Sequence, residues 1–250
     1  MNHVLITGGA AGIGFAIARR FVEDGARVLI CDVDEQGLDA ARAALPGLRT
    51  VRCDVSRIAD IEALFGAVDA ELGRLDVLVN NVGIGGPTLP AEQLPSAEWQ
   101  RVLDINLTGT FEVTRRAIPL LRQSAGTIIN MSSAAGRYGY PNRIAYSVTK
   151  WGLIGFTKTL AMELGSDGIS VNAILPGAVG GERFDRVMQG RAALSGRSIE
   201  EELAAGLASQ SLKRVVDPAH VADLALFLTT PSGRSLSGQM LPIDCDLQHG

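Results

Sequence analysis

The segment HVLITGGAAGIGFAIARRFVED, residues 3–24, decides the fold that the sequence predicts. It begins with a short apolar run rich in β-branched residues, typical of a buried strand, and ends with a helix-like stretch. Between them lies TGGAAGIG, residues 7–14, whose glycines let the backbone turn sharply and approach a phosphate. An ordinary turn is the alternative, but the strand–loop–helix context favours a dinucleotide-binding loop. No Gly-Lys-Ser/Thr follows, unlike in nucleotide-hydrolysing P-loops.

Six further apolar runs alternate with helix-like segments along the chain. Most are continuously hydrophobic, as are strands of a sheet that helices cover on both faces. They occupy residues 26–33, 48–55, 75–83, 126–133, 169–177 and 239–244. We therefore predict an α/β fold, a single-domain Rossmann-type doubly wound parallel sheet of about seven strands with helices on both faces. No repeat or linker divides residues 1–250, so one domain is expected.

Residues 180–216 depart from this strand–helix rhythm. They contain two short helix-like pieces, ERFDRVMQGRAAL (182–194) and SIEEELAAGLAS (198–209). Asp217 and Pro218 then supply a capping residue and an N1 proline for the next helix. Because long insertions at the carboxyl edge of a sheet are usually functional, we expect 180–216 to be a substrate lid.

The composition indicates a globular protein that binds neither nucleic acid nor membranes. The 250 residues are 46% hydrophobic and 20% charged, with a net charge of −4 that does not attract a polyanion. No run reaches the roughly 18 apolar residues of a membrane span, and the N-terminus does not resemble a signal peptide. Cys31, Cys53 and Cys245 show no C-x-x-C pairing, so we expect no disulfide framework, no metal site and a reducing cytoplasm.

The end of the second predicted strand indicates which dinucleotide is preferred. Asp32 stands there, and a carboxylate at this place accepts hydrogen bonds from the adenosine ribose and repels a 2′-phosphate. Neither residues 9–14 nor Val33 supplies the cation that a phosphate-bearing ribose would require. The sequence thus favours NAD over NADP. A solvated loop residue is the alternative role for Asp32, and it is weak beside the glycine loop.

The segment AYSVTKWGL, residues 145–153, places a tyrosine and a lysine on one face of a helix. Tyr146 and Lys150 are four positions apart, which is close to one helical turn. An incidental surface pair has the same spacing. Ser132 and Ser133 end the fifth predicted strand, at the sheet edge where the glycine loop also lies. Open α/β sheets bind their ligands at this edge.

Seven motifs occur along the chain in a fixed order. They are T-G-x-x-x-G-x-G at 7–14, the pair Asp54-Val55, N-N-x-G at 80–83, the asparagine of DINLTG at Asn106, the serine after the fifth strand, Y-x-x-x-K at 146–150 and P-G at 176–177. In this order they resemble the short-chain dehydrogenase/reductase family over essentially the whole length. Each motif alone is weak, whereas the set is specific. The family spacing between serine and tyrosine selects Ser133, with Ser132 as the alternative.

The resemblance implies a catalytic set of Asn106, Ser133, Tyr146 and Lys150. Tyr146 would exchange a proton with the substrate hydroxyl. A free phenol, with a pKa of about 10, is a poor base at neutral pH, but an ammonium and an oxidised nicotinamide nearby favour phenolate. Ser133 would hold the substrate oxygen where charge develops. Asn106 would position a water that links Lys150 to solvent, and a helix break or cap is its alternative role.

The same resemblance implies NAD as cofactor and contacts from its adenine to its nicotinamide. Asp54 and Val55 would touch the adenine, and Lys150 would hydrogen-bond the nicotinamide ribose. A homotetramer is also implied, built partly through the helix that carries Tyr146. The implied cofactor contacts are Gly8, Gly12, Ile13, Gly14, Asp32, Val33, Asp54, Val55, Asn81, Val82, Gly83, Tyr146, Lys150, Pro176, Gly177 and Val179.

Three positions depart from the family pattern. Val82 replaces the usual alanine, which we expect to be tolerated. Gly181 replaces a threonine, which removes one expected hydrogen bond to the nicotinamide amide. The last strand continues into Cys245-Asp246 where many relatives have two glycines. None of these departures removes a catalytic group.

Arginines near the predicted cleft bear on the substrate. Arg143 precedes the catalytic helix, and Arg183 and Arg186 begin the 180–216 segment. A guanidinium binds a carboxylate, phosphate or sulfonate bidentately, although pairing with a neighbouring acidic side chain is the alternative for each arginine. We therefore predict a small polar or anionic hydroxy or keto substrate that contacts Ser133, Arg143 and Arg183.

Three functions compete at this point. The leading one is an NAD-dependent alcohol dehydrogenase or carbonyl reductase. An NADPH-dependent 3-oxoacyl thioester reductase shares every motif, and Asp32 argues against it. A noncatalytic dinucleotide-binding protein could use the same fold, and the complete catalytic set argues against that alternative.

Overall fold

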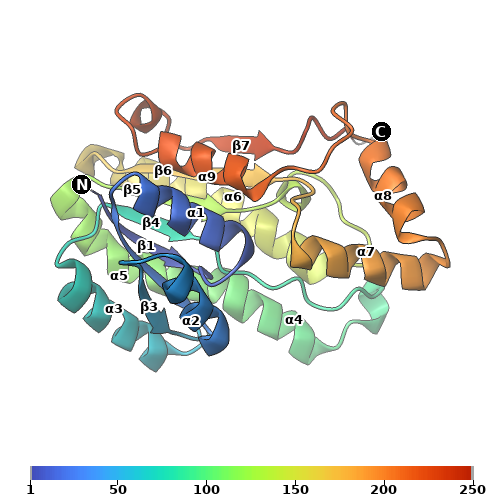
Figure 1. Ribbon diagram of the computed structural model, residues 1–250, viewed down its shortest axis with the longest axis horizontal. Coiled ribbons are helices and arrows are strands. Elements are labelled where there is room, and N and C mark those ends of the chain that lie inside the picture. Colours follow the sequence, from blue (N-terminus) through green and yellow to red (C-terminus); the bar gives the residue numbers. More distant parts are fainter. Residues whose placement is uncertain (1, 249–250) are drawn as a thin grey trace.

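Seven parallel strands form one sheet in the computed structural model, which describes residues 2–248 (Figure 1). The side chains of Glu182, Arg183, Arg186 and Leu194 lie outside that description. Every strand falls inside an apolar run predicted from the sequence, and the predicted Rossmann-type architecture is confirmed. The strands are β1 (His3–Thr7), β2 (Arg27–Asp32), β3 (Arg49–Arg52), β4 (Val77–Asn80), β5 (Thr127–Met131), β6 (Ser170–Pro176) and β7 (Met240–Ile243).

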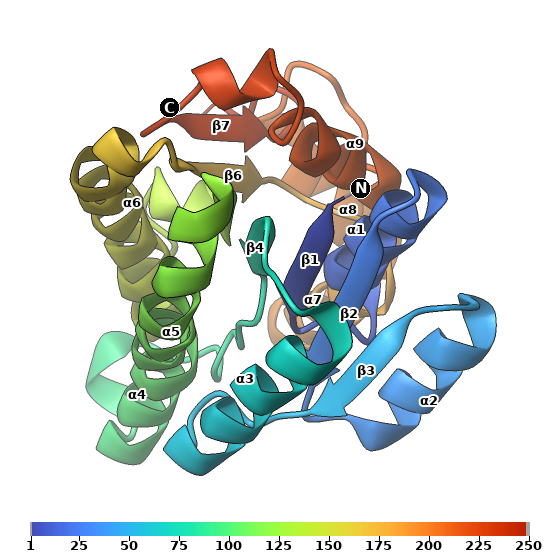
Figure 2. The same ribbon diagram turned by 90° about the vertical axis from the view of Figure 1, so that its left-hand side faces the viewer.

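Helices cover both faces of the sheet, as the continuous apolar runs require (Figure 2). One buried cluster joins the sheet to α1, α2 and α9, and a second joins its other face to α3, α5 and α6. None of the helices in residues 2–248 is both long and apolar enough to cross a bilayer. The helices are α1 (Gly12–Glu23), α2 (Glu35–Ala44), α3 (Ile58–Leu72), α4 (Ser96–Leu103), α5 (Gly109–Ser124), α6 (Ile144–Leu164), α7 (Glu182–Ser195), α8 (Ile199–Ala208) and α9 (Pro218–Phe227).

The strand order places a crevice next to β1. The order is β3-β2-β1-β4-β5-β6-β7, so the chain leaves β1 in one direction as far as β3 and then returns to the other side at β4. At such a switch point the loops diverge and leave space at the carboxyl ends of the strands. Thr7 ends β1 and pairs with Asn80 at the end of β4. The glycine loop and the N-N-x-G motif therefore flank this crevice.

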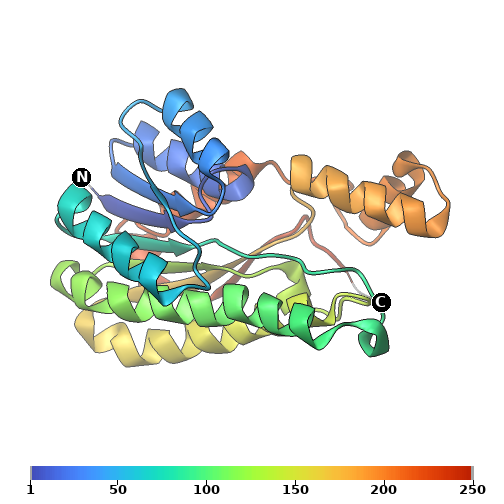
Figure 3. The same ribbon diagram turned by 90° about the horizontal axis from the view of Figure 1, so that it is seen from below.

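Helices α7 and α8 extend away from the sheet at the end toward which the strands point (Figures 1 and 3). Both predicted helical pieces of this segment are confirmed. The segment leaves and re-enters the domain at one place, because Val179 and Val216 form a parallel bridge. The amide of Val216 donates to the Ala178 carbonyl at 2.8 Å. Asp217 caps α9 by accepting from the amide of Ala219 at 2.8 Å, as predicted.

Candidate active site

The glycine loop between β1 and α1 leaves no room for a side chain at Gly14. A Cβ there would lie 2.1 Å from the carbonyl oxygen of Gly8. Gly8 and Gly12 have φ angles of +63° and +55°, a region that L-residues with side chains avoid. The loop is thus a bare backbone cradle beside the crevice, and its polar groups can approach a diphosphate closely.

Asn81 holds this cradle in place from the end of β4. Its side-chain amide nitrogen donates to the carbonyls of Gly8 at 2.7 Å and Thr7 at 3.1 Å. In return, the Thr7 hydroxyl accepts from the amides of Asn81 and Val82 at 3.1 and 3.2 Å. The side chain of Asn81 therefore supports the loop. Thr7 was not predicted as a site residue, although it is the first residue of the T-G-x-x-x-G-x-G motif at 7–14.

Asp32 lies beside the glycine loop. One carboxylate oxygen accepts from the amide of Ala10 at 3.2 Å, and the other accepts from the amide of Asp34 at the same distance. The side chain of the adjacent Val33 is 57% exposed. A carboxylate and an exposed apolar surface thus lie together at the carboxyl end of β2.

Asp54 and Val55 mainly make contacts within the protein. Asp54 accepts from the amide and the hydroxyl of Ser56, at 3.0 and 2.7 Å. Desolvation acts to raise the pKa of Asp54, but these hydrogen bonds and nearby arginines lower it overall. Val55 is buried against α5, where a Cβ on Gly109 would lie 2.7 Å from its carbonyl oxygen. Contact with an adenine would therefore fall mainly to the backbone and to the exposed part of Asp54.

Tyr146 and Lys150 lie one turn apart on α6, which confirms the predicted helix. Lys150 is only 4% exposed, and its ammonium donates to the carbonyl of Met131 at 2.7 Å. The same ammonium lies 5.6 Å from the centre of the Tyr146 ring. A Cβ on Gly83 would lie 3.2 Å from the Lys150 Nζ, so the N-N-x-G segment reaches this end of the crevice. The structure thus brings together a phenol, a buried ammonium and the loop after β4.

The two serines after β5 have different environments. Ser132 is buried and donates its hydroxyl to the carbonyl of Lys150 at 2.8 Å, so it fastens α6 to the sheet. Ser133 is half-buried, and its oxygen accepts from the amide of Ala135 at 3.1 Å. That contact leaves the Ser133 hydroxyl proton for another acceptor. Between the two alternatives, the geometry favours Ser133 as the substrate-facing serine.

Asn106 is fully buried in a turn of π-helix, Asp104–Thr108, between α4 and α5. Its side-chain oxygen accepts from the amide of Ile84 at 2.8 Å. Its amide nitrogen donates to the Ile84 carbonyl and to the Thr149 hydroxyl, both at 3.0 Å. Asn106 therefore joins three segments next to Lys150. π-Helical turns occur frequently at functional sites.

The carboxyl end of β6 supplies the last group of predicted contacts. Gly177 follows Pro176 and donates to the Ile243 carbonyl at 3.1 Å, and a Cβ on it would lie 2.7 Å from the Asp244 Cα. Gly181 precedes α7 with a φ of +121°. Its conformation disfavours threonine, so the departure from the family pattern has a backbone reason.

Cys245 and Asp246 have left-handed conformations, with φ angles of +58° and +56°. This is the region that glycine adopts without strain. The backbone therefore keeps the shape that two glycines would give it, although the chain has other residues there.

Arg143 lies directly before α6, and its guanidinium carbon is 5.5 Å from the centre of the Tyr146 ring. It is also 5.7 Å from the centre of the Tyr140 ring. Arg191 from α7 donates to the Tyr140 hydroxyl at 2.8 Å. Arg143 is thus brought to Tyr146, whereas the side chain of Arg183 lies outside the described residues. Tyr140 and Arg191 were missed, because no sequence motif marks them.

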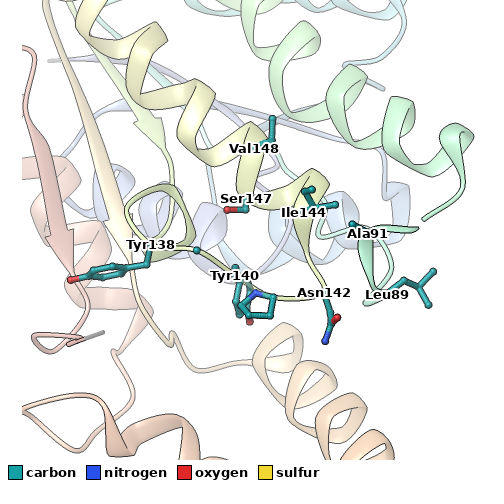
Figure 4. Close-up of a pocket in the computed structure, with 10 residues that line it drawn as sticks. Leu89, Ala91, Tyr138, Tyr140, Asn142, Ile144, Ser147 and Val148 are labelled. Carbon is teal, nitrogen blue, oxygen red and sulfur yellow. The ribbon is translucent and has the colours of Figure 1, made fainter. Parts of the chain in front are cut away.

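A groove of about 680 Å³ opens next to the loop between β5 and α6 (Figure 4). Tyr138 and Tyr140 line it together with the exposed side of α6 around Ser147. None of the four predicted catalytic side chains lines the groove. In Figure 4 Tyr138 points away toward the C-terminal segment, where its hydroxyl donates to the Leu247 carbonyl at 2.9 Å.

A family model described as enoyl-(acyl carrier protein) reductase matches residues 8–246. The chain is 38% identical over 227 residues to the L-fucose dehydrogenase of Oryctolagus cuniculus, covering 91% of this chain and 78% of that one. It is 36% identical to the galactitol 2-dehydrogenase of Agrobacterium fabrum, covering 96% and 94%. The NAD(+) enzyme 2-dehydro-3-deoxy-L-rhamnonate dehydrogenase of Sphingomonas sp. is 38% identical, covering 74% and 75%.

Solved structures of the same shape hold different nicotinamide cofactors. The actinorhodin polyketide ketoreductase with NADPH superposes with a TM-score of 0.93 at 34% identity, covering 97% of this chain and 95% of that one. An NAD+-bound xylitol dehydrogenase superposes with a TM-score of 0.92 at 29% identity, covering 97% of both. Together with the glycine cradle, these similarities indicate a nicotinamide dinucleotide as cofactor.

Proposed function

Because this chain belongs to the short-chain dehydrogenase/reductase family, acting as an oxidoreductase on sugar-like alcohols, we propose that Tyr146 is its acid/base and NAD its cofactor. The observation that carries the proposal is the Tyr146 phenol beside the buried Lys150 ammonium, at the sheet edge that also holds the glycine cradle. Ser133, with a half-buried hydroxyl after β5, completes the set.

The residues divide the reaction between them. In the oxidising direction the substrate hydroxyl loses its proton to the Tyr146 oxygen, while its carbon loses a hydride. When bound, the nicotinamide cofactor supplies the acceptor for that hydride. Ser133 donates its hydroxyl to the substrate oxygen and holds it in place during proton transfer. The Lys150 ammonium, 5.6 Å from the centre of the Tyr146 ring, supplies a positive charge beside the oxygen that exchanges the proton.

The cofactor contacts follow the crevice from β2 to β6. The bare backbone at Gly8, Gly12 and Gly14, where a Cβ would collide with the loop or strain it, fits a diphosphate. Asp32 would accept hydrogen bonds from the adenosine ribose hydroxyls, and Val33 would cover the adenine. The remaining contacts would come from Ile13, Asp54, Val55, Asn81, Val82, Gly83, Pro176, Gly177 and Val179.

The preference for NAD over NADP is part of this proposal. The Asp32 carboxylate is already aimed at the glycine loop through the amide of Ala10, so a 2′-phosphate on the ribose would meet a negative charge. The ketoreductase with NADPH shows that this fold also serves the other cofactor. Dissociation constants for NADH and NADPH test the preference, and tighter binding of NADPH would favour a 3-oxoacyl thioester reductase instead.

The proposal extends to assembly and location. We assign a homotetramer built partly on α6, whose residues Val148 and Trp151 are exposed apolar surface, and on the last helix and strand around Phe227 and Met240. We assign the cytoplasm because the three cysteines are unpaired. Light scattering of the purified protein tests the tetramer.

A substrate screen tests the function directly. Polyols, sugars and hydroxy acids are incubated with NAD, and the absorbance of the reduced cofactor is followed. We expect turnover with at least one vicinal diol or sugar and its loss in Tyr146→Phe. Ser132→Ala is the matched comparison with Ser133→Ala, because only Ser133 is expected to face substrate. Turnover that survives in Tyr146→Phe would contradict the proposed acid/base.

A further inference from the structure

Two arginines and a second tyrosine form a chain of contacts that reaches Tyr146. The Arg143 guanidinium lies within 6 Å of the ring centres of both Tyr140 and Tyr146. The Arg191 guanidinium lies 5.9 Å from the centre of the Tyr140 ring and donates to its hydroxyl. A guanidinium that stacks on aromatic rings is held in a fixed orientation.

Neither of these two arginines has an acidic partner among the side chains that the structure describes. Among the described side chains, no carboxylate lies within 4 Å of either Arg143 or Arg191, although most other arginines of this chain have such a partner. Among the described residues, the Arg143 guanidinium makes one long hydrogen bond, from Nη1 to the Thr88 hydroxyl at 3.4 Å. Its Nε is buried and has no acceptor. Within the described part of the chain, this ordered guanidinium next to the Tyr146 phenol therefore has unused donors and no anionic partner.

We infer that Arg143 binds the carboxylate of a hydroxy acid of the sugar-acid class, with Tyr140 and Arg191 holding it in position from the loop and from α7. This inference rests on the proposed function, because it names the substrate class of the same site. The substrate's reacting hydroxyl faces Tyr146. Since Arg143 lies only 5.5 Å from that ring, few bonds separate the carboxylate from the oxidised carbon. Neutral polyols fill the same cleft but leave the guanidinium unpaired.

The reaction itself is unchanged by the anionic group. The C–H bond of the secondary alcohol breaks and its electron pair leaves as hydride to NAD+, while the O–H proton passes to Tyr146. The carboxylate keeps its charge throughout. Arg143 therefore contributes to binding and orientation, and its removal affects KM more than kcat.

Matched pairs of acid and polyol test the inference. Galactonate and xylonate are compared with galactitol and xylitol, which share most of their hydroxyls and lack the charge. We expect the wild type to favour the acids in kcat/KM. We expect Arg143→Gln to lower the ratio of acid to polyol kcat/KM by about 10- to 100-fold, the range for a charge-assisted hydrogen bond. Arg143→Lys should restore part of the ratio, because it keeps the charge without the bidentate geometry.

The control is Arg137→Gln on the same loop. The Arg137 guanidinium lies 5.0 Å from the centre of the Tyr138 ring, and among the described residues it contacts neither Arg143 nor Tyr140. The ratio should therefore stay at the wild-type value. Equal losses for acid and polyol in Arg143→Gln, or a wild type that prefers the polyols, would overturn the inference and leave the proposed function standing.

A binding measurement separates the two claims. Titration calorimetry of galactonate into the NADH-loaded enzyme needs no turnover. We expect Arg143→Gln to raise the Kd for galactonate by the same factor of about 10- to 100-fold. Absence of galactonate binding by the wild type overturns the inference. Absence of NAD turnover on every compound, with galactonate still bound through Arg143, would instead contradict the proposed function.

Discussion

Replacing Gly14 by alanine tests the cradle on which the cofactor site depends. A Cβ at position 14 would lie 2.1 Å from the Gly8 carbonyl oxygen and 2.5 Å from the Asn81 amide nitrogen. Neither atom can retreat easily, because Asn81 donates to that same carbonyl at 2.7 Å. The loop and the N-terminal turn of α1 must therefore separate.

The magnitude follows from two opposing terms. In an open helical position, glycine to alanine stabilises a protein by about 0.5–1 kcal/mol. Overpacking of this kind destabilises by about 1–3 kcal/mol and exceeds that gain. For a chain of this size we expect Gly14→Ala to lower Tm by roughly 2–10 °C. We expect its Kd for NADH to rise at least about 10-fold, which corresponds to about 1.4 kcal/mol.

Gly66→Ala is the matched control. Gly66 lies within α3, and nothing lies within 4 Å of the Cβ that it would gain. Thermal unfolding and titration of NADH fluorescence are measured on both variants. Gly66→Ala should be at least as stable as the wild type and bind NADH equally well. If Gly14→Ala gains stability as Gly66→Ala does and keeps its affinity for NADH, the reasoning about the cradle is wrong.

Three further predictions concern single side chains. Asp32→Asn should lower the preference for NADH over NADPH by about 10- to 100-fold in Kd, since it removes a charged acceptor from the ribose; an unchanged ratio would place the ribose elsewhere. Burial acts to raise the pKa of Asp76, but hydrogen bonds from Arg74 and His3 lower it overall. The Asp76 carboxylate therefore stabilises the fold fully when the pH is above its pKa in the unfolded chain. This stabilisation is lost as the pH falls through its pKa in the folded protein. Asp76→Asn should therefore lower the free energy of unfolding by about 1–3 kcal/mol at pH 7, and urea titrations should show the difference between wild type and variant closing below about pH 4. A difference in stability that does not depend on pH would contradict this. Ala125 ends α5 with a φ of +48°, a conformation that glycine adopts without strain, so Ala125→Gly should raise the free energy of unfolding by up to about 1 kcal/mol. A lower free energy of unfolding would show that the contacts of the Ala125 methyl group outweigh the backbone strain.

Local sequence patterns were sufficient to predict the sheet and the central pair of the site. The central strands are buried on both faces and therefore read as nearly unbroken apolar runs; β4, β5 and β6 are buried at every position. Helical spacing predicted that Tyr146 and Lys150 lie on one face, because both residues belong to one helix. The family spacing favoured Ser133 over Ser132, and the structure adds a physical reason for that order, because the Ser132 hydroxyl is bonded to a carbonyl of α6.

Contacts between distant segments could not be predicted from such patterns. Thr7 supports a loop that follows it by more than seventy residues, and Arg191 meets Tyr140 across the space between α7 and the β5–α6 loop. Periodicity describes one element at a time, whereas these contacts depend on how the elements pack. The family pattern supplied Asn106 and left its surroundings unknown, and the structure shows a π-helical turn that ties it to Ile84 and Thr149.

The N-terminus of α6 combines features that oppose stability and fit an anionic ligand. Arg143 occupies the cap position without a capping hydrogen bond, and the first turn of this 21-residue helix contains no acidic residue. A cation at the positive end of a helix dipole is unfavourable by about 0.3–1 kcal/mol, and serine, threonine or aspartate would serve the helix better. Stability is commonly sacrificed in this way at functional sites. The helix that carries Tyr146 and Lys150 therefore begins with a positive potential that a bound carboxylate would neutralise.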